Sequence, residues 1–399
     1  MKSKMPIRPW QMFALLFLFS FTIFSSCKKD DDNVNPKDND PIKLLCGELD
    51  LPRTLTNDPD RPVDYLIECN MSVNNDLVIE PGVVIAFKSG TGLDIRESGS
   101  ISAVGTASEP ILFTGVEKVK GSWAGIMIQG SSPLNKLQFV TVEYGGQEGY
   151  WSNSVSGNVN TWVNARLVMN NSKLNKSLTY GMNVYHLGPA NVTLNENSYK
   201  ENQIPLRINA NSIWIPSPTD DYTGNVESKV EVVFASSAIE EDRTWRKINV
   251  PYKTTGTHNL VINATLTIAP GTHIEMGQNT GIIVNEIGGL KIVGSPLDRI
   301  VIQGELGVKG SWHKIFYQGS NINNEIGFTD ILHGGQDITG DPGTIYVWYN
   351  ARLNIHDVHF EELNNCAIAY RVTGGQTFNP NLTYSNLSFS NVPCEFVEY

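Results

Sequence analysis

The sequence is poor in the patterns that form helices, and it lacks the short motifs that mark several enzyme classes. Outside the first thirty residues, apolar side chains rarely recur with the ~3.6-residue period of an amphipathic helix. None of the motifs HExxH, GxSxG, GxGxxG or the phosphate-binding P-loop occurs. These absences argue against a helical or α/β protein and against the enzymes that those motifs identify. They do not exclude an active site assembled from residues on different turns of a fold.

Positive charge and cysteine are both scarce. The chain carries 30 Lys and Arg against 41 Asp and Glu, which gives a net charge of −11. Nucleic acid and anionic lipid are therefore not expected as partners. The five cysteines show no CxxC or Cys/His spacing typical of a zinc site, so no metal is predicted from them. Abundant Asn and Thr and 35 Gly instead indicate short strands joined by tight turns.

The first residues form a predicted export signal. A basic stretch precedes the apolar run 13–24, which is too short to span a bilayer and is followed by Ser-Ser-Cys. Small residues directly before a cysteine resemble the lipobox of bacterial lipoproteins. The resemblance implies that residues 1–26 are removed and that Cys27 is lipidated, which changes the net charge to −11 − 3 = −14. The alternative is an ordinary signal peptide with an incidental cysteine.

The segment behind Cys27 is polar and charged. "CKKDDD" at 27–32 resembles the surface-export signal of Bacteroidota lipoproteins. This resemblance implies a protein that is lipid-anchored in the outer membrane and exposed at the cell surface. Residues 27–44 contain few apolar side chains and predict a flexible acidic tether. The three acyl chains of a bacterial lipoprotein are expected to anchor it stably.

The rest of the sequence repeats itself. Residues 77–123 align without a gap to residues 266–312, at an offset of 189, and 18 of the 47 positions are identical. Both segments begin with closely similar hexapeptides, LVIEPG and LTIAPG, and both end with VKGSW. Further pairs follow, such as WVNARL and WYNARL. We therefore predict two homologous units, residues 45–225 and residues 226–399.

A finer period lies inside each unit. The octapeptides LNIHDVHF (353–360) and LTYSNLSF (382–389) share four apolar positions and a polar residue at the fifth, and IGFTDILH (326–333) follows the same pattern. The pattern predicts two short strands that meet at a left-handed bend. Repetition every 25 to 30 residues allows each turn to bury the apolar face of its neighbour. A parallel β-solenoid is the predicted architecture.

Several motifs resemble a known group of proteins. LTIxPGT, GxWxGI and NARLxI, within about residues 60–210 and 240–399, are similar to segments of the right-handed parallel β-helix proteins common among Bacteroidota cell-surface lipoproteins. The resemblance implies an all-β fold, a right-handed parallel β-helix (β-solenoid) built from the two homologous units. It says little about activity, because β-helices include lyases, hydrolases, adhesins and binding proteins.

Two disulfides are predicted. Disulfides persist in exported proteins, and the four cysteines other than Cys27 form two close pairs, Cys46 with Cys69 and Cys366 with Cys394. The second pair is separated by 28 residues, which is close to one turn. We expect this disulfide to join the last two turns and to protect the end of the solenoid.

A loop that differs between the units is the predicted ligand site. Between the shared GGQ and NAR motifs, the first unit has an insertion that the second unit lacks. Tyr150 and Trp151 have no counterparts there, and aromatic rings beside Glu148 and Asn153 suit the apolar face and hydroxyl groups of a sugar. The alternative is that the loop only covers the side of the solenoid. Four tryptophans that repeat between the units are assigned to packing: Trp123, Trp162, Trp312 and Trp348.

No catalytic residue and no metal ligand is predicted. None of the seven histidines aligns with a histidine of the other unit, and His356 and His359 lack a third ligand. The stacking predicts a column of Asp330, Asp357 and Asn386, which could attract Ca²⁺ through oxygen ligands. A ladder of hydrogen-bonded turns is the favoured interpretation, so no cofactor is expected.

The sequence therefore favours non-catalytic binding of a glycan or another extracellular partner, such as a polysaccharide or a surface protein. A carbohydrate-active enzyme of the polysaccharide lyase or glycoside hydrolase type is the leading alternative, because such enzymes can use acid/base residues from different turns. A structural spacer or adhesin is the third hypothesis. The ligand and the oligomeric state do not follow from the sequence.

Overall fold

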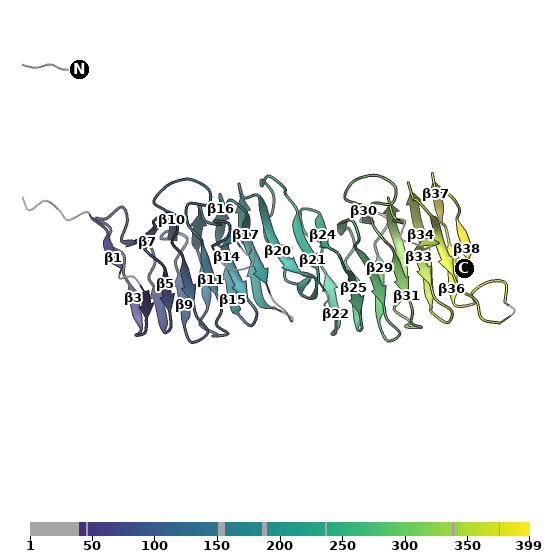
Figure 1. The fold of residues 1–399 in the computed structure, drawn as a ribbon, viewed down its shortest axis with the longest axis horizontal. Helices are drawn as coiled ribbons and strands as arrows, with labels where there is room; N and C mark the ends of the chain where they lie inside the picture. The colour runs from purple at the N-terminus through teal and green to yellow at the C-terminus, as the bar shows by residue number, and fades with distance from the viewer. Residues whose placement is uncertain are drawn as a thin grey trace, which may run out of the picture. The chain divides into compact units, whose positions relative to one another are not determined.

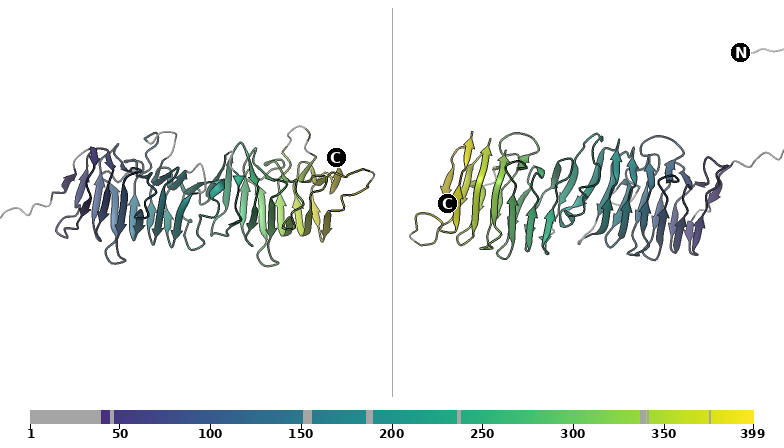
Figure 2. Two further views of the ribbon diagram at one scale, coloured as in Figure 1. Left: turned by 90° about the horizontal axis from the view of Figure 1, so that it is seen from below. Right: turned by 180° about the vertical axis from the view of Figure 1, so that it is seen from behind.

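A computed structural model describes residues 40–44, 47–150, 156–185, 190–235, 238–336, 340, 342–374 and 376–399. These residues belong to one compact unit, Asn39–Tyr399. The strands pair in parallel, each with a strand of the next turn, such as β1 with β4 and β35 with β38, and the turns follow one another in chain order along the long axis (Figure 1), as the views in Figure 2 also show from below and from behind. The fold is the predicted right-handed parallel β-solenoid, with about 13 turns.

Helical structure is nearly absent from the described residues. Their one helix is the short 3₁₀ turn η1 (Ala210–Ser212). In this part of the chain no helix is long and apolar enough to cross a membrane. The scarcity of helical periodicity in the sequence is thus matched by an all-β structure.

The first half of the solenoid has three faces, which we name sheets A, B and C. Sheet A consists of β1 (Ile42–Leu44), β4 (Tyr65–Ile67), β7 (Val84–Phe87), β10 (Ile111–Gly115), β13 (Val140–Glu143), β16 (Lys173–Asn175) and β19 (Ser198–Lys200). Sheet B begins with β2 (Gly47–Leu49), β5 (Met71–Val73), β8 (Leu93–Ile95), β11 (Ile126–Ile128), β14 (Gly157–Trp162), β17 (Tyr180–Tyr185) and β20 (Ile204–Asn209). Sheet C consists of β3 (Arg53–Leu55), β6 (Asp76–Ile79), β9 (Ser100–Val104), β12 (Lys136–Gln138), β15 (Arg166–Asn170) and β18 (Asn191–Asn195).

In the second half, sheet B continues beside two new faces, sheets D and E. Sheet B adds β21 (Val230–Phe234), β24 (Tyr252–Gly256), β27 (His273–Met276), β30 (Ile300–Gly304), the second parts of β32 (Glu325–Leu332) and β34 (Leu353–Glu361), and β37 (Ser388–Ser390). Sheet D consists of β22 (Ala238–Ile239), β25 (Asn259–Ile262), β28 (Gly281–Val284), β31 (Ile315–Tyr317), β33 (Gly343–Val347), β35 (Cys366–Tyr370) and β38 (Phe396–Glu398). Sheet E consists of β23 (Arg243–Trp245), β26 (Thr265–Ile268), β29 (Gly289–Val293), the first parts of β32 and β34, and β36 (Leu382–Ser385).

Sheet B runs through the junction between the two halves. Val230 of β21 pairs with Leu206 on one side and with Tyr252 on the other. In the repeat alignment, β24 corresponds to β4 of sheet A, whereas β20 belongs to sheet B. In the second half, the first strand of each turn therefore lies in sheet B, which holds the second strand of each turn in the first half. The solenoid is continuous, but the second half begins one face further round. That the halves are two copies of one ancestral unit stays a prediction.

Alternating side chains fill the interior. Strands such as β6 and β26 bury every second residue, as expected for a sheet with one face in the core. Trp123 and Trp312 are fully buried, and the indole N–H of each donates to a backbone carbonyl one strand away, at 2.9 and 2.8 Å. Trp162 and Trp348 are only half-buried, and Trp348 packs against the hydrophobic core as predicted. Side chains alternate between the two faces of a strand, and both tryptophans stand at positions that face outward.

The predicted left-handed bends are present, but one column is shifted. Asp357 and Asn386 adopt positive φ angles of 54° and 49° at the bends of consecutive turns. The third member of the column is Phe328, with φ 46°, and not Asp330, because β32 and β34 pair at a spacing of 29 residues. That register aligns the inward side chains of both strands. Asp330 instead lies opposite His359 on sheet B.

A disulfide joins the last two turns. Cys366 in β35 is bonded to Cys394, just before β38. Cys69 is also disulfide-bonded, and its predicted partner Cys46 lies outside the described residues. Within the described chain, the final strands β36, β37 and β38 each pair with the preceding turn only. The disulfide therefore restrains a turn that has neighbours on one side.

Removal of this disulfide is expected to release the last turn. In a Cys366→Ser, Cys394→Ser variant, cleavage by chymotrypsin at Tyr384, which is already 53% exposed, should become at least several-fold faster, because local opening no longer works against a covalent link. Mass spectrometry of the fragments measures this effect. Equal cleavage rates in the oxidised wild type and the variant would contradict it, and faster cleavage near Tyr65 would indicate general destabilisation instead.

Candidate ligand-binding site

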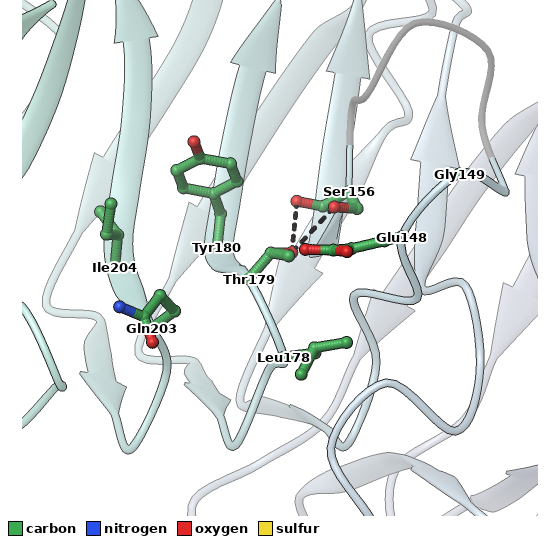
Figure 3. A pocket seen from close by; sticks show the side chains of 8 residues that line it. All are labelled: Glu148, Gly149, Ser156, Leu178, Thr179, Tyr180, Gln203 and Ile204. Carbon is green, nitrogen blue, oxygen red and sulfur yellow. Dashed lines mark hydrogen bonds between the residues drawn. The ribbon is translucent and has the colours of Figure 1, made fainter.

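A pocket of about 750 Å³ opens beside the sheet B strands of three successive turns (Figure 3). Its position is set by the starts of β14, β17 and β20 in sheet B and by the chain that leaves the GGQ motif. It is lined by Glu148, Gly149, Ser156, Leu178, Thr179, Tyr180, Gln203 and Ile204. The lining combines hydroxyl groups, an amide, a phenol ring and one carboxylate.

The GGQ motif directs the chain that follows β13 toward this pocket. Gly145 N–H donates to Asn158 Oδ1 (2.9 Å), which holds the turn after β13 against the start of β14. Gly146 has a φ of 81°, and a Cβ atom there would lie 2.2 Å from Ser177 Oγ. Any larger residue would therefore clash and be strained. The turn delivers Glu148 to the pocket wall, as Figure 3 shows.

Hydroxyl groups join neighbouring turns at the floor of the pocket. Thr179 Oγ1 donates to the carbonyl oxygen of Ser156 (2.8 Å), and Ser156 Oγ donates to Thr179 Oγ1 (3.0 Å). Ile204 N–H donates to the carbonyl of Thr179 (3.1 Å), which continues the ladder into the next turn. Parallel pairing thus brings together residues that are more than 20 positions apart in the sequence.

Tyr180 connects the pocket to a charged cluster on sheet B. Its hydroxyl donates to Glu231 Oε2 (3.2 Å), and Arg207 Nε is 3.3 Å from Glu231 Oε1. Burial, and then the charge of Glu231, raise the pKa of Tyr180 to about 12. Tyr180 is therefore a neutral phenol at physiological pH. Its ring stands at the edge of the pocket (Figure 3), where it can contact an apolar ligand face.

Two buried amides lie in β14 and β17, the strands whose first residues border the pocket. Asn160 and Asn183 are paired neighbours on sheet B and are fully buried. Asn160 Nδ2 donates to the carbonyl of Gly157 (3.0 Å), and Asn183 Oδ1 accepts a bond from Arg207 (3.2 Å). Asn160 Oδ1 and Asn183 Nδ2 have no hydrogen-bond partner in the part of the chain that the structure describes. Because buried amides are normally satisfied, these atoms are suited to a bound water or a ligand hydroxyl.

The structure brings only some of the predicted ligand residues to the pocket. Glu148 lines it, whereas Tyr150 is half-buried, and its pKa is raised by burial and then by the charge of Asp94. Trp151 and Asn153 lie outside the described residues. Cys27 lies outside them as well.

Of the eight lining residues only Glu148 was predicted; the four others with polar side-chain groups are Ser156, Thr179, Tyr180 and Gln203. They come from three turns and lie 23 to 24 residues apart, so no short sequence window contains them. The LT and NQ dipeptides just before β17 and β20 form no motif that identifies a site. These residues could have been found by aligning, turn by turn, the residues that precede each strand of sheet B.

The second polar cluster lies around β32 and β34. A groove of about 460 Å³ includes Arg299, Asp330, Asp357 and His359. Arg299 Nη2 is 2.7 Å from Asp330 Oδ1, so this carboxylate already has a cation partner. The hydrogen bond from His356 is the largest cause that lowers the pKa of Asp357. Among the described residues no group of three or more His, Cys, Asp or Glu side chains is placed to hold a metal ion.

The fold defines this chain as a parallel β-helix repeat protein. Residues 55–171 match the family model described as a pectate-lyase-like β-helix domain. Comparison with curated proteins and with solved structures found no match. A β-helix domain of this type fits a surface binding role or a pectate-lyase-like role.

Proposed function

We propose that this protein is a non-catalytic binding protein for neutral glycans and that the pocket beside Glu148 is its ligand site. The observation that supports this proposal is the composition of the pocket wall. The described lining residues offer two hydroxyl groups, an amide and a phenol ring, but only one carboxylate. Hydrolysis of a glycosidic bond usually needs two carboxyl groups on opposite sides of the bond.

The pocket chemistry suits a sugar. Ser156, Thr179 and Gln203 can exchange hydrogen bonds with hydroxyl groups, and Tyr180 and the 43% exposed Leu178 offer apolar surface to a ring face. A volume of about 750 Å³ lies in the usual range of small-ligand pockets. The one charged lining residue, Glu148, repels anions. The proposal is therefore restricted to neutral sugars and does not extend to uronates.

A pectate-lyase-like enzyme is the second candidate function. The family match over residues 55–171 favours it, because the matched segment contains Glu148 and the start of β14. A lyase acting on an acidic polymer would need cationic groups near the substrate carboxylate. The described lining of the pocket includes no lysine and no arginine, so we place binding first.

The proposed location follows from the N-terminal sequence. We propose that Cys27 carries the lipid that anchors the protein in the outer membrane and that residues 27–44 tether the solenoid at the cell surface. The bound partner would then be an extracellular polysaccharide or a glycosylated surface protein. Two measurements would test the anchor: globomycin should make a larger precursor accumulate, with residues 1–26 uncleaved, and a Cys27→Ser variant should lose incorporation of labelled palmitate.

Removal of the pocket amide is expected to weaken binding. A protein of residues 45–399 is applied to a glycan array, and the best neutral oligosaccharide is titrated by calorimetry. Gln203→Ala should raise the dissociation constant about tenfold, since one or two ligand hydrogen bonds are lost. Gln138→Ala, which removes an amide from the outer side of sheet C, is the matched control and should change nothing.

Product analysis separates the candidate functions. New reducing ends or unsaturated sugar products on incubation with array hits would contradict the non-catalytic proposal and favour the enzyme. Equal affinities of wild type and Gln203→Ala for the oligosaccharide would show that the ligand binds outside this pocket. Absence of any binding or turnover would favour the spacer or adhesin hypothesis.

A further inference from the structure

The outer face of sheet D carries a second cluster with ligand-binding chemistry. In the last turns, Trp348, Arg371 and Tyr399 succeed one another in register: Arg371 N–H donates to the carbonyl of Val347, and Tyr399 N–H donates to the carbonyl of Tyr370. The neighbouring outward column contains Phe316 and Tyr346. We call the cluster of Phe316, Tyr346, Trp348, Tyr349, Arg371 and Tyr399 the sheet D platform.

The rings of the platform support one another. Phe316 and Tyr346 are stacked, with centroids 4.8 Å apart and an interplanar angle of 17°. Trp348 stands edge-on to both at 5.8 Å, and Tyr349 packs against Trp348 at 4.7 Å. Tyr349 is 37% exposed and Tyr399 is 45% exposed. Part of a preformed aromatic surface is thus open to solvent.

Lys314 Nζ lies 5.3 Å and 5.6 Å from the ring centres of Phe316 and Tyr346, and the second cation of the platform is Arg371. Its guanidinium lies 4.1 Å from the ring centre of Tyr399 and 5.6 Å from that of Trp348, and its Nε donates to Tyr346 Oη (3.3 Å). Among the described residues no carboxylate makes an ion pair with Arg371. The rings fix the plane of the guanidinium, which leaves its terminal N–H groups available as a fork for an anion.

The platform is not required by the solenoid. In the first half, the alignment places Met127, Asn160 and Trp162 where the second half has Phe316, Tyr346 and Trp348, and it places Tyr185 where the second half has Arg371. At the aligned positions the first half has a stacked Trp162–Tyr185 pair, in which Tyr185 stands in the place of Arg371. Arg371 is an addition to a corner that folds without it.

We propose that the sheet D platform binds an acidic carbohydrate. The Arg371 fork would hold a carboxylate or sulfate group, and the open faces of Tyr349 and Tyr399 would hold sugar rings. A peptide strand is a poorer fit to most of the platform, because β33 and β35 are hydrogen-bonded on both sides. β38 pairs on one side only among the described residues, so a strand added beside Tyr399 is the alternative that an acidic peptide tests. This site is separate from the pocket beside Glu148 and does not depend on its function.

Matched polymers test the proposal. Dextran, carboxymethyl-dextran and dextran sulfate share one backbone, so affinity electrophoresis or calorimetry with the three isolates the effect of the anion. Wild type should bind both anionic polymers and bind dextran at least tenfold more weakly. Arg371→Gln should lose about tenfold in affinity for the anionic polymers, and Tyr349→Ala should lose several-fold. Lys136→Gln, which removes one positive charge from sheet C, should lose little.

Several results would overturn the proposal that the sheet D platform binds an acidic carbohydrate. Equal binding by wild type and Arg371→Gln, or an equal loss in Lys136→Gln, would overturn the proposal, because the attraction would then be non-specific. Tighter binding of polyglutamate than of carboxymethyl-dextran, unaffected by Tyr349→Ala, would also overturn it. Thermal unfolding of each variant, together with Arg371→Lys as a charge-retaining substitution, distinguishes lost binding from lost folding. The Gln203→Ala variant should bind the anionic polymers like wild type, which separates this site from the pocket.

Discussion

Replacement of Trp312 by alanine is expected to lower the free energy of unfolding by about 3–5 kcal/mol. The indole is fully buried between turns, and its N–H donates to the carbonyl of Leu332 at 2.8 Å. Alanine would leave a cavity, and the carbonyl would lose a donor in the interior. Urea unfolding followed by circular dichroism measures the effect.

Trp123 offers a matched test of the same environment. It occupies the aligned position, is fully buried, donates to Glu143 at 2.9 Å and stacks on Phe87 with centroids 4.0 Å apart. Trp123→Ala should therefore cost a similar amount. Trp162→Ala, on the outer face, should cost much less. A smaller loss for Trp312→Ala than for Trp162→Ala would contradict the assignment of inner and outer positions.

Stability is expected to fall as the pH rises from about 4 to 6 because of Asp220. This carboxyl group is 3% exposed and accepts bonds from Asn197 N–H (2.9 Å) and from the hydroxyl of Tyr199 (3.3 Å). Burial raises its pKa from 3.8 to about 6 in the folded state. The folded state therefore holds the proton more tightly than the unfolded state does. The contribution is complete below pH 3.8 and is lost above pH 6.

The expected size of this effect is about 3 kcal/mol, since each pKa unit corresponds to about 1.4 kcal/mol. Asp220→Asn keeps the shape of the side chain and removes the titration. The difference in unfolding free energy between the variant and wild type, measured at several pH values, should increase from pH 4 to pH 6.5 in favour of the variant. A difference that does not change with pH would contradict the raised pKa.

Asp221 provides the opposite control. Burial acts to raise the pKa of this neighbouring carboxyl group, but hydrogen bonds from Lys200 and Thr223 outweigh burial and lower it overall. Its contribution to stability is therefore present above the ordinary pKa and is lost as the pH falls. Asp221→Asn should destabilise the protein at pH 7. The two adjacent substitutions should thus act in opposite directions.

The solenoid could be predicted from the sequence because stacked turns require the same apolar pattern in each turn, and that pattern repeats visibly. The gap-free alignment of residues 77–123 with 266–312 and the recurring octapeptides required only that each turn hide the apolar side of its neighbour. The register was harder to predict. Phe328 occupies a left-handed bend that the polar pattern assigned to Asp330, because inward packing of β32 against β34 decides the pairing and the bend residue adapts to it.

The change of faces at the junction could not be predicted from the alignment. Matching β24 to β4 identifies equivalent strands, but it does not show that β24 stacks on β21, which itself stacks on β20 of sheet B. The segment between β20 and β21 sets that rotation, and it has no counterpart earlier in the chain. Packing between turns decides on which face β24 lies, and no local sequence pattern reveals that packing.

The candidate site was predictable only where the two halves differ. Glu148 was found because its loop is longer than the corresponding loop of the second half and differs from it in sequence. Thr179 and Gln203 were not found, since they are 24 residues apart and become neighbours only through pairing between turns. The sheet D platform was hidden for a related reason: Trp348 repeats, which suggested packing, whereas the special feature is Arg371 in the next turn.

Hydrogen exchange with a bound ligand tests the central claim most directly. The neutral oligosaccharide with the strongest array signal is added to the protein of residues 45–399, and amide exchange is followed by mass spectrometry. We predict slower exchange in segments 145–150, 177–181 and 202–205, which surround the pocket, and unchanged exchange in sheet C. Protection confined to sheet C or sheet D, with no change around Thr179 and Gln203, would contradict the proposed site.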